Sequence, residues 1–192
     1  EDIKGTKGEE LKGRKVVVGV TGSVAAVRSV NLVRELMRHG AEVRVVMSEA
    51  ATRLVTPQLF HWASGNEVVS GLTGEIEHVE LAQWADAVVV APATANTLSK
   101  IAWGIDDTPV TSVVSVALGL RKPVLLVPAM HLSMYEHPVL MENLKRLNSA
   151  GAQVVEPTIE EGKAKFPPVE QVVERVISLL GPRDMGGLRV LI

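Results

Sequence analysis

The stretch AVVVAPATANTLSK (Ala87–Lys100) decides the fold that the sequence predicts. It begins with four apolar, mostly β-branched residues, which are typical of a buried parallel strand. We expect Pro92 to end this strand, because proline has no amide hydrogen to donate to a neighbouring strand. Thr94 or Asn96 is then expected to cap a helix. Small polar side chains at this point suit a phosphate or the edge of a ring, although an ordinary strand-to-helix turn accounts for them equally well.

Units of the same kind precede and follow this stretch along the chain. Short apolar segments at Val16–Val20, Val43–Met47 and Val124–Val127 predict further strands. Val24–His39 and Val169–Leu180 carry apolar residues at helical spacing. Alternating strands and helices, joined by right-handed crossovers, predict an α/β fold with a doubly wound parallel sheet in three layers, as in Rossmann-like proteins.

Composition narrows the class of protein. The 192 residues are enough for one sizeable α/β domain and few for two. A net charge of −2 without a basic stripe argues against a nucleic-acid partner. Because no apolar run is long enough to span a bilayer and no signal peptide is visible, we expect no membrane partner and a cytoplasmic protein. The chain has no cysteine, which removes disulfides, thiolate metal sites and cysteine nucleophiles and is compatible with a reducing cytoplasm.

Two further loops are expected beside the one that begins at Thr94. Gly22 and Ser23 follow the first strand, and Ser48 follows the second. The glycine spacing departs from the dinucleotide fingerprint, and Ser48 stands where a carboxylate that binds a ribose would be expected. A hydroxyl suits a phosphate better than a ribose diol. The three loops therefore predict a mononucleotide pocket at one edge of the sheet.

Asp106 and Asp107 raise the question of a metal site. Adjacent carboxylates point in different directions, and no third ligand lies nearby in the sequence. We therefore expect no metal. Asp107 or Thr108 is expected to cap a helix that has Pro109 in its first turn.

Three segments are expected to lie outside the regular α/β pattern. Residues 1–13 form a polar arm, which we expect to be flexible or draped over a partner. Residues 158–168 carry four charged residues and almost no apolar anchor, which predicts a mobile segment, either a solvated loop or a flap. Residues 181–192 are expected to be a linker followed by LRVLI, the truncated first strand of another domain.

Four motifs, taken in order, resemble the flavin-containing cysteine decarboxylases. They are VTGSVAAV (Val20–Val27), VVMSEAA (Val45–Ala51), HVELAQWADAVVVAPATANTLSKIA (His78–Ala102) and VPAMHLSMYEHP (Val127–Pro138). Within that family, PAMH and IEEGKAKFP (Ile159–Pro167) are similar to the archaeal phosphopantothenoylcysteine decarboxylases, which are fused to a ligase. The resemblance covers residues 14–180, the expected FMN-binding decarboxylase domain. The ending GGLRVLI (186–192) is similar to the start of the ligase domain.

The resemblance implies a flavodoxin-like fold, bound FMN, and a homotrimer that is able to assemble further into a dodecamer. It also implies which residues meet the cofactor. These are Gly22 and Ser23 in the first loop, Ser48 in the second, Thr94, Ala95, Asn96 and Thr97 in the third, and Ala129 at a backbone position beside the flavin ring.

The resemblance further implies the residues of the reaction. His78, in the pattern H-x-x-L-x-x-W-A-D, matches the family's catalytic histidine, which takes a proton from the substrate. The family's motif PAMN is PAMH here, so Met130 and His131 stand at the substrate, with His131 in place of an asparagine that contacts the carboxylate. The family's flap carries a proton-donating cysteine, which this chain lacks. Lys163 and Lys165 lie in the matching stretch and are the candidate donors.

The reaction implied is FMN-dependent decarboxylation of 4'-phosphopantothenoylcysteine to 4'-phosphopantetheine, a step of coenzyme A biosynthesis. Oxidation of the carbon that bears the thiol gives a thioaldehyde, which loses CO₂ and is then reduced. Two alternatives stay open. One is another reaction of the family, namely peptidyl-cysteine decarboxylation or flavin prenylation. The other is a flavin-binding regulatory subunit without turnover, which the missing cysteine favours and the retained His78 disfavours.

Overall fold

A computed structural model describes residues 3–72 and 77–180, and strands alternate with helices along this part of the chain. A six-stranded sheet forms the middle layer, and each of its strands runs parallel to its neighbours. Its strands, in spatial order, are β3 (Val68–Val69), β2 (Glu42–Met47), β1 (Lys15–Val20), β4 (Ala87–Ala93), β5 (Val124–Pro128) and β7 (Ala152–Val154).

This strand order explains both fold descriptions that the sequence suggested. Without the two-residue β3, the strands follow the order 2-1-3-4-5 of flavodoxin-like sheets. With β3 at the edge, the order becomes 3-2-1-4-5-6, that of the Rossmann sheet. The predicted doubly wound parallel sheet is confirmed.

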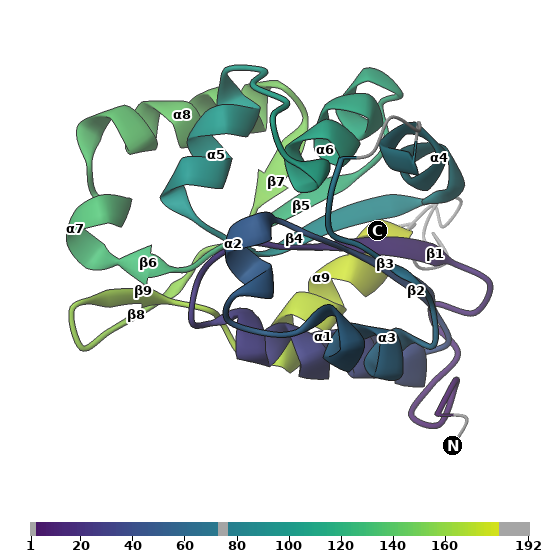
Figure 1. Ribbon diagram of the computed structural model, residues 1–192. Helices are drawn as coiled ribbons and strands as arrows, with labels where there is room; N and C mark the ends of the chain where they lie inside the picture. Colours follow the sequence, from purple (N-terminus) through teal and green to yellow (C-terminus); the bar gives the residue numbers. More distant parts are fainter. Residues whose placement is uncertain (1–2, 73–76, 181–192) are drawn as a thin grey trace, which may run out of the picture.

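Helices cover both faces of the sheet and complete three layers (Figure 1). One face carries α1 (Ala26–Arg38), α3 (Pro57–Ser64) and α9 (Val169–Leu180). The other face carries α4 (Glu77–Trp84), α5 (Ala95–Ala102), α6 (Pro109–Gly119) and α8 (Pro138–Ser149). Two short helices, α2 (Glu49–Thr52) and α7 (Leu132–Tyr135), follow β2 and a short strand beyond β5. Within the described residues, no helix is both long and apolar enough to cross a membrane.

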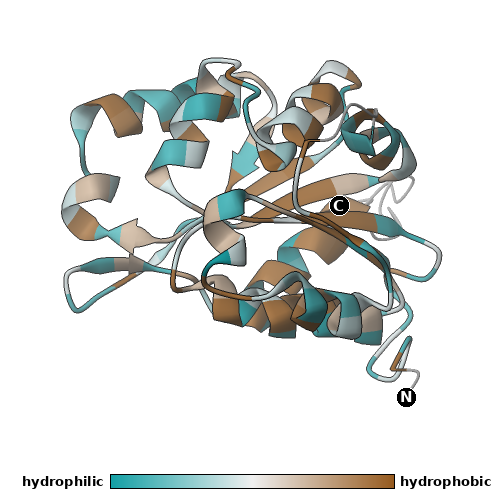
Figure 2. Cartoon of the chain, in the orientation of Figure 1, coloured by the Kyte–Doolittle hydropathy of each residue, from teal (hydrophilic) through white to brown (hydrophobic). Residues whose placement is uncertain are grey.

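Successive residues of the central strands face opposite layers. Val16 and Val18 pack against the layer of α1 and α9, while Val17 between them packs against the layer of α6. All three side chains are fully buried. Figure 2 accordingly shows hydrophobic residues along much of the central strands and hydrophilic residues on the surrounding helices. Burial on both faces is why these strands are continuous apolar runs rather than alternating ones.

Pro92 does not end β4, which continues to Ala93. The pairing of β4 with β5 shifts register between Val90 and Ala93, so the proline lies at an irregularity where a missing amide hydrogen is tolerated. The expectation that the strand ends at Pro92 is therefore wrong by one residue, and α5 begins two residues after the strand, at Ala95.

Residues 158–165, expected as either a solvated loop or a flap, form a β-hairpin. β8 (Thr158–Glu160) and β9 (Lys163–Lys165) pair antiparallel through a two-residue turn, Glu161-Gly162, in which both residues have positive φ. The other edge of β9 pairs with β6 (Met130–His131), giving a small three-stranded sheet. Buried Ala164 and Phe166 anchor the hairpin to the domain.

The polar arm, described from residue 3 onward, packs against the carboxyl end of α1. The backbone amides of Lys7 and Leu11 donate to the carbonyls of Arg38 and His39, and the Leu11 side chain is fully buried. Gly40 permits this approach, because a side chain there would come within 3.0 Å of the Lys12 backbone. The expectation of a flexible or partner-draped arm is corrected accordingly. The expected linker and strand at residues 181–192 lie outside the described part.

Candidate functional site

Three loops meet at the carboxyl edge of the sheet, as the sequence predicts. They follow β1, β2 and β4, which are neighbours in the sheet. The strand order reverses between β1 and β4, and parallel sheets of this type bind ligands in the crevice at such a point. Thr21–Ser23 and Thr94 flank this crevice from the two sides.

The buried hydroxyl of Thr21 fastens the first loop to the third. It donates to the carbonyl of Pro92 at 2.7 Å and accepts the amide hydrogen of Thr94 at 3.1 Å. Ser29, one turn into α1, donates to the carbonyl of Ala91 at 2.6 Å. These bonds fix the end of β4, and sequence analysis did not single out either hydroxyl for this role.

Close packing joins the first loop to the second. A side chain at Gly22 would meet the Cβ of Ala50 at 2.6 Å, a contact that only glycine avoids. Ser48, almost fully buried, accepts the amide hydrogen of Ala51 at 3.2 Å and so caps α2. Both predicted cofactor residues therefore hold the loops together, whatever they bind.

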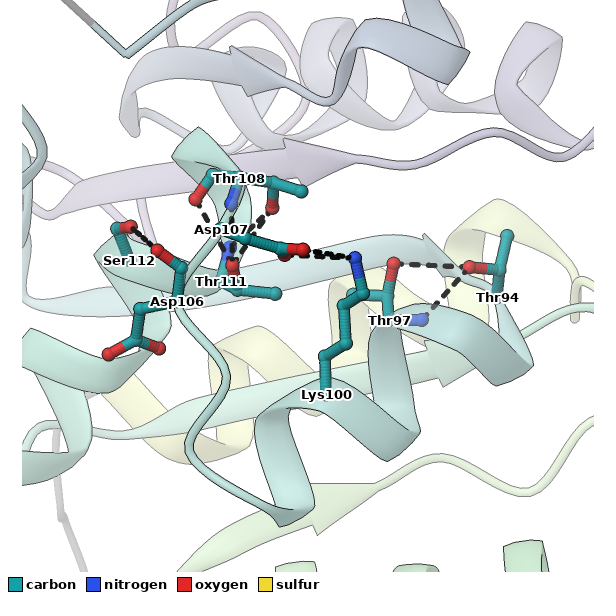
Figure 3. Close-up of polar contacts among 8 residues, drawn as sticks. All are labelled: Thr94, Thr97, Lys100, Asp106, Asp107, Thr108, Thr111 and Ser112. Atoms are coloured by element: carbon teal, nitrogen blue, oxygen red, sulfur yellow. Dashed lines mark hydrogen bonds and ion pairs between the residues drawn. The ribbon is translucent and has the colours of Figure 1, made fainter.

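Thr94 caps α5, the helix of the third loop. Its hydroxyl accepts the amide hydrogen of Thr97 at 3.2 Å and lies 3.1 Å from the Thr97 hydroxyl (Figure 3). Of the two capping residues that the sequence suggested, Thr94 and Asn96, Thr94 is the one that caps α5. Asn96 is exposed and Ala95 is half-buried, and both line a cavity of about 370 Å³ shared with α7 and α8.

The acidic pair after α5 has a structural role. Asp107 forms an ion pair with Lys100 at 2.7 Å, and the amide and hydroxyl of Thr108 make a capping box with Thr111 at the start of α6 (Figure 3). Pro109 occupies the first turn of α6, as expected. The described residues hold no cluster of histidine, aspartate or glutamate that suits a metal ion.

A second cavity, of about 450 Å³, lies between the start of α1 and the small sheet. One wall consists of residues around Ser23–Arg28, and the other of residues from β6 and β9. The cavity brings together Ser23, Ala129, Met130, His131, Lys163 and Lys165 from the predicted site. Gly22, Ser48, Thr94 and Thr97 lie at the same edge of the sheet but do not line it.

His131 presents one ring nitrogen to a ligand. Its Nδ1 accepts the amide hydrogen of Ser133 at 3.3 Å and lies 2.9 Å from the Ser133 hydroxyl. An amide nitrogen only donates, so this contact assigns the proton of the neutral ring to Nε2. The exposed imidazole thus retains a hydrogen-bond donor, as the amide of an asparagine would.

The two flap lysines differ in their surroundings. Lys165 pairs with Glu160 at 2.9 Å and also with Glu161. Hydrogen bonds to these carboxylates, Glu161 first, raise the pKa of Lys165 above its usual range and make it a weaker acid. Lys163 is exposed and makes no ion pair within the described part of the chain. It lies directly across the strand pair from His131.

His78 lies far from this cavity within one chain. It is half-buried in the first turn of α4, whose start lies beside Arg44 and Val69. Figure 1 shows α4 at the right of the molecule and β6 and β9 at its left. The structure therefore groups His131 with Lys163 and leaves His78 apart from both.

Arg28 lines the 450 Å³ cavity and was missed by the sequence analysis. It lies in the first turn of α1 and is exposed. A single arginine on a helix gives no motif, because most such residues are solvated. Only the folding of the small sheet against α1 places this side chain beside His131 and Lys163.

Comparison with known proteins adds to this geometry. The model of the flavoprotein family matches residues 4–181. The chain is 52% identical over 194 aligned residues to a coenzyme A biosynthesis bifunctional protein, CoaBC, of Thermococcus kodakarensis. That alignment covers 99% of this chain and 48% of the relative, so the chain spans about half the length of this curated relative.

Solved structures of related proteins share the fold. The FMN-dependent cysteine decarboxylase SpaF superposes with a TM-score of 0.77 at 29% identity, over 88% of this chain and 97% of its own. A mutant PPC decarboxylase complexed with pantothenoylaminoethenethiol superposes with a TM-score of 0.72 at 27% identity, over 85% and 96% of the two chains.

Proposed function

Because this chain belongs to the flavoprotein family, we propose that it binds FMN and decarboxylates 4'-phosphopantothenoylcysteine to 4'-phosphopantetheine. The observation that carries this proposal is the 450 Å³ cavity, which gathers Ser23, Ala129, His131 and Lys163 from three separate segments. The similarity to CoaBC and to PPC decarboxylase supports the choice of substrate.

The residues at the carboxyl edge fit a flavin mononucleotide. The first turn of α1 holds no acidic residue, and its N-cap, Ala25, makes no side-chain capping bond, so this helix start is open to a phosphate. Hydroxyls of Ser23, Ser48, Thr94 and Thr97 lie at the same edge, where each retains capacity for a further hydrogen bond. We propose that Gly22 and these hydroxyls, with Ala95, Asn96 and Ala129, hold the cofactor.

Bound FMN supplies a reversible two-electron acceptor for the carbon that bears the thiol. The chain's own residues then bind and protonate the substrate. Nε2 of His131 donates a hydrogen bond to the substrate carboxylate, and Met130 gives an apolar contact beside it. Lys163, across the strand pair, adds a positive charge to the same wall and is placed to donate a proton at the substrate carbon.

His78 requires a second copy of the chain. Because it lies far from the cavity of its own chain, we propose that it reaches the cavity of a neighbour in a homotrimer, where its imidazole takes the thiol proton. We propose that a dodecamer, where one forms, is assembled from four such trimers.

We also propose the domain organisation that the motifs imply. Residues 14–180 form the decarboxylase domain, and residues 181–192 lead into a ligase domain, in keeping with the bifunctional relatives of about twice this length. A cytoplasmic location accords with this biosynthetic role.

The test is CO₂ release by purified, FMN-loaded protein. We expect yellow protein with close to one FMN per chain, and CO₂ and 4'-phosphopantetheine in equal amounts from 4'-phosphopantothenoylcysteine. Protein that stays colourless with added FMN, or that binds FMN without releasing CO₂, contradicts the proposal.

One alternative is favoured by a specific observation. SpaF, an FMN-dependent cysteine decarboxylase, superposes with a higher TM-score than PPC decarboxylase. A peptide that ends in cysteine is therefore the second substrate to assay. Turnover of the peptide in preference to the phosphorylated substrate supports this alternative.

A further inference from the structure

The 450 Å³ cavity between α1 and the small sheet has an unbalanced set of charges. Its lining holds four basic side chains, Arg28, His131, Lys163 and Lys165, and no carboxylate from the described residues. A cavity of this kind attracts anions, because low-dielectric walls strengthen the field of unpaired cations.

The charges of this lining are not all available to a ligand. Lys165 is held by Glu160 and Glu161, and Nδ1 of His131 is occupied by Ser133. Arg28 and Lys163 are exposed, and neither has an ion-pair partner in the part of the chain that the structure describes. The cavity thus offers two unpaired cations.

These two cations lie on different walls. Lys163 is the cross-strand partner of His131 in the small sheet, whereas Arg28 projects from α1. Arg28 also borders a larger cavity of about 600 Å³, whose lining includes Arg38 and Lys165, paired with Glu35 and Glu160, and a third glutamate, Glu170. Arg28 is therefore the cation without an ion-pair partner, among the described residues, that an anion contacts at the boundary of the two cavities.

The substrate of the proposed function carries two anionic groups at its two ends, a carboxylate and a phosphate monoester. If His131 and Lys163 take the carboxylate, the phosphate needs a separate cation. A guanidinium suits it best, because two parallel N–H groups bind two phosphate oxygens at once.

We propose that Arg28 is the residue that recognises the substrate phosphate and so distinguishes a phosphorylated substrate from a peptidyl cysteine. This inference rests on the proposed function. The flavin phosphate is the other phosphate monoester present, and the start of α1, which carries Arg28, is also the helix start proposed for it, so the experiment measures FMN affinity separately.

The experiment compares 4'-phosphopantothenoylcysteine with pantothenoylcysteine, which lacks the phosphate, using FMN-loaded full chain. We expect the wild type to prefer the phosphorylated substrate by about tenfold to a hundredfold in kcat/KM, mainly through KM, the effect of one charge-assisted contact. Arg28→Gln abolishes this preference, because kcat/KM falls for the phosphorylated substrate toward its value for pantothenoylcysteine. Arg28→Lys keeps part of the preference for the phosphorylated substrate, since lysine has the positive charge but lacks the two parallel N–H groups of a guanidinium.

Arg175→Gln is the matched control, because Arg175 is exposed on α9 and lines none of the cavities described above. We expect it to keep the wild-type preference. The inference is overturned if Arg28→Gln keeps that preference, or if it weakens FMN binding in a fluorescence titration while the loaded enzyme still prefers the phosphorylated substrate.

Failure of the proposed function gives a different result. A wild type that releases CO₂ from neither compound refutes the decarboxylation and not the role of Arg28. In that case calorimetry compares 4'-phosphopantetheine with pantetheine as ligands. Tighter binding of the phosphorylated compound that Arg28→Gln abolishes supports the inference, and equal affinities overturn it.

Discussion

The polar side chains at the carboxyl edge of the sheet serve two purposes. Thr21 and Ser48 bond to backbone groups and hold the loops, and Lys165 bonds to the glutamates of its own hairpin. Nε2 of His131 and the ammonium of Lys163 remain directed to a ligand. Substitutions within the first group should change stability and cofactor affinity, whereas those within the second should change catalysis with the fold intact.

His78→Asn tests the proposed general base. We expect the variant to bind FMN like the wild type and to lose turnover by roughly a hundredfold or more, the usual contribution of a lost base. His39→Asn is the control, because His39 follows the end of α1 and pairs with Glu10 of the arm, away from the cavity. Steady-state CO₂ release measures both. Near-normal turnover of His78→Asn removes the proposed role.

The two flap lysines should separate in kinetics. We expect Lys163→Ala to slow the final reduction by roughly a hundredfold, while flavin reduction in the first half-reaction is nearly unchanged. Lys165→Ala should affect both half-reactions little, because its pKa is raised by Glu161 and Glu160 and it is a poor acid. Stopped-flow absorbance follows each half-reaction. Equal effects of the two substitutions contradict the assignment to Lys163.

At the scale of helices and strands, the sequence predicted the elements whose residue pattern is local, such as the buried strands. The valine runs of β1, β2 and β4 are buried on both faces, so their composition alone indicates parallel strands. The hairpin at residues 158–165 was missed, because its pairing with β6 is a tertiary contact. Its one local signal is the two-residue turn Glu161-Gly162, which favours a hairpin.

In the candidate site, too, the parts fixed by local sequence were predictable and the parts fixed by tertiary packing were not. The loops that hold Gly22, Ser48 and Thr94 were predictable, since parallel strands bring their carboxyl ends to one edge. The cavity wall formed by Arg28 was not, because it depends on how the small sheet packs beside α1. The catalytic role of His78 was predicted from a motif, and a motif does not indicate whether the residue acts in the site of its own chain or of a neighbouring copy.

Contact between the arm and α1 gives a prediction at this scale. Glu35, almost buried on α1, bonds to Lys7 of the arm at 2.8 Å and to Arg38. Burial alone would raise the pKa of Glu35, but the hydrogen bonds from Lys7 and Arg38 outweigh it and lower the pKa. The ionised carboxylate therefore stabilises the fold above the unfolded pKa of about 4.3.

Glu35→Gln should lower the free energy of unfolding by about 1–2 kcal/mol at pH 7. This loss should shrink as the pH falls below about 4.3 and through the lowered pKa of the folded state, because protonation then removes the same bonds from the wild type. Urea unfolding at pH 7 and at pH 3.5 measures it. Glu49→Gln, in an exposed pair with Arg53, should change stability by less than about 0.5 kcal/mol at either pH.

For the whole molecule, the open question is how many copies of the chain make one active site. Leu59 and Trp62 on α3 are 41% and 61% exposed, and Val24 and Val27 at the start of α1 are 79% and 61% exposed. Large apolar side chains exposed on adjoining helices are typical of an interface. We therefore expect light scattering at micromolar concentration to give three times the chain mass, or a multiple of it.

Complementation tests whether His78 serves a neighbouring copy. His78→Asn leaves the cavity intact, and His131→Ala leaves His78 intact, so each variant alone should have little activity. In a cyclic trimer that mixes both at random, a cavity from the first variant faces a His78 from the second at about one site in four. Co-expression should therefore restore roughly a quarter of wild-type CO₂ release, whereas separately purified variants, assayed together without subunit exchange, should restore none. No recovery in mixed trimers whose composition mass spectrometry verifies would place both residues in sites of their own chain and contradict the shared site.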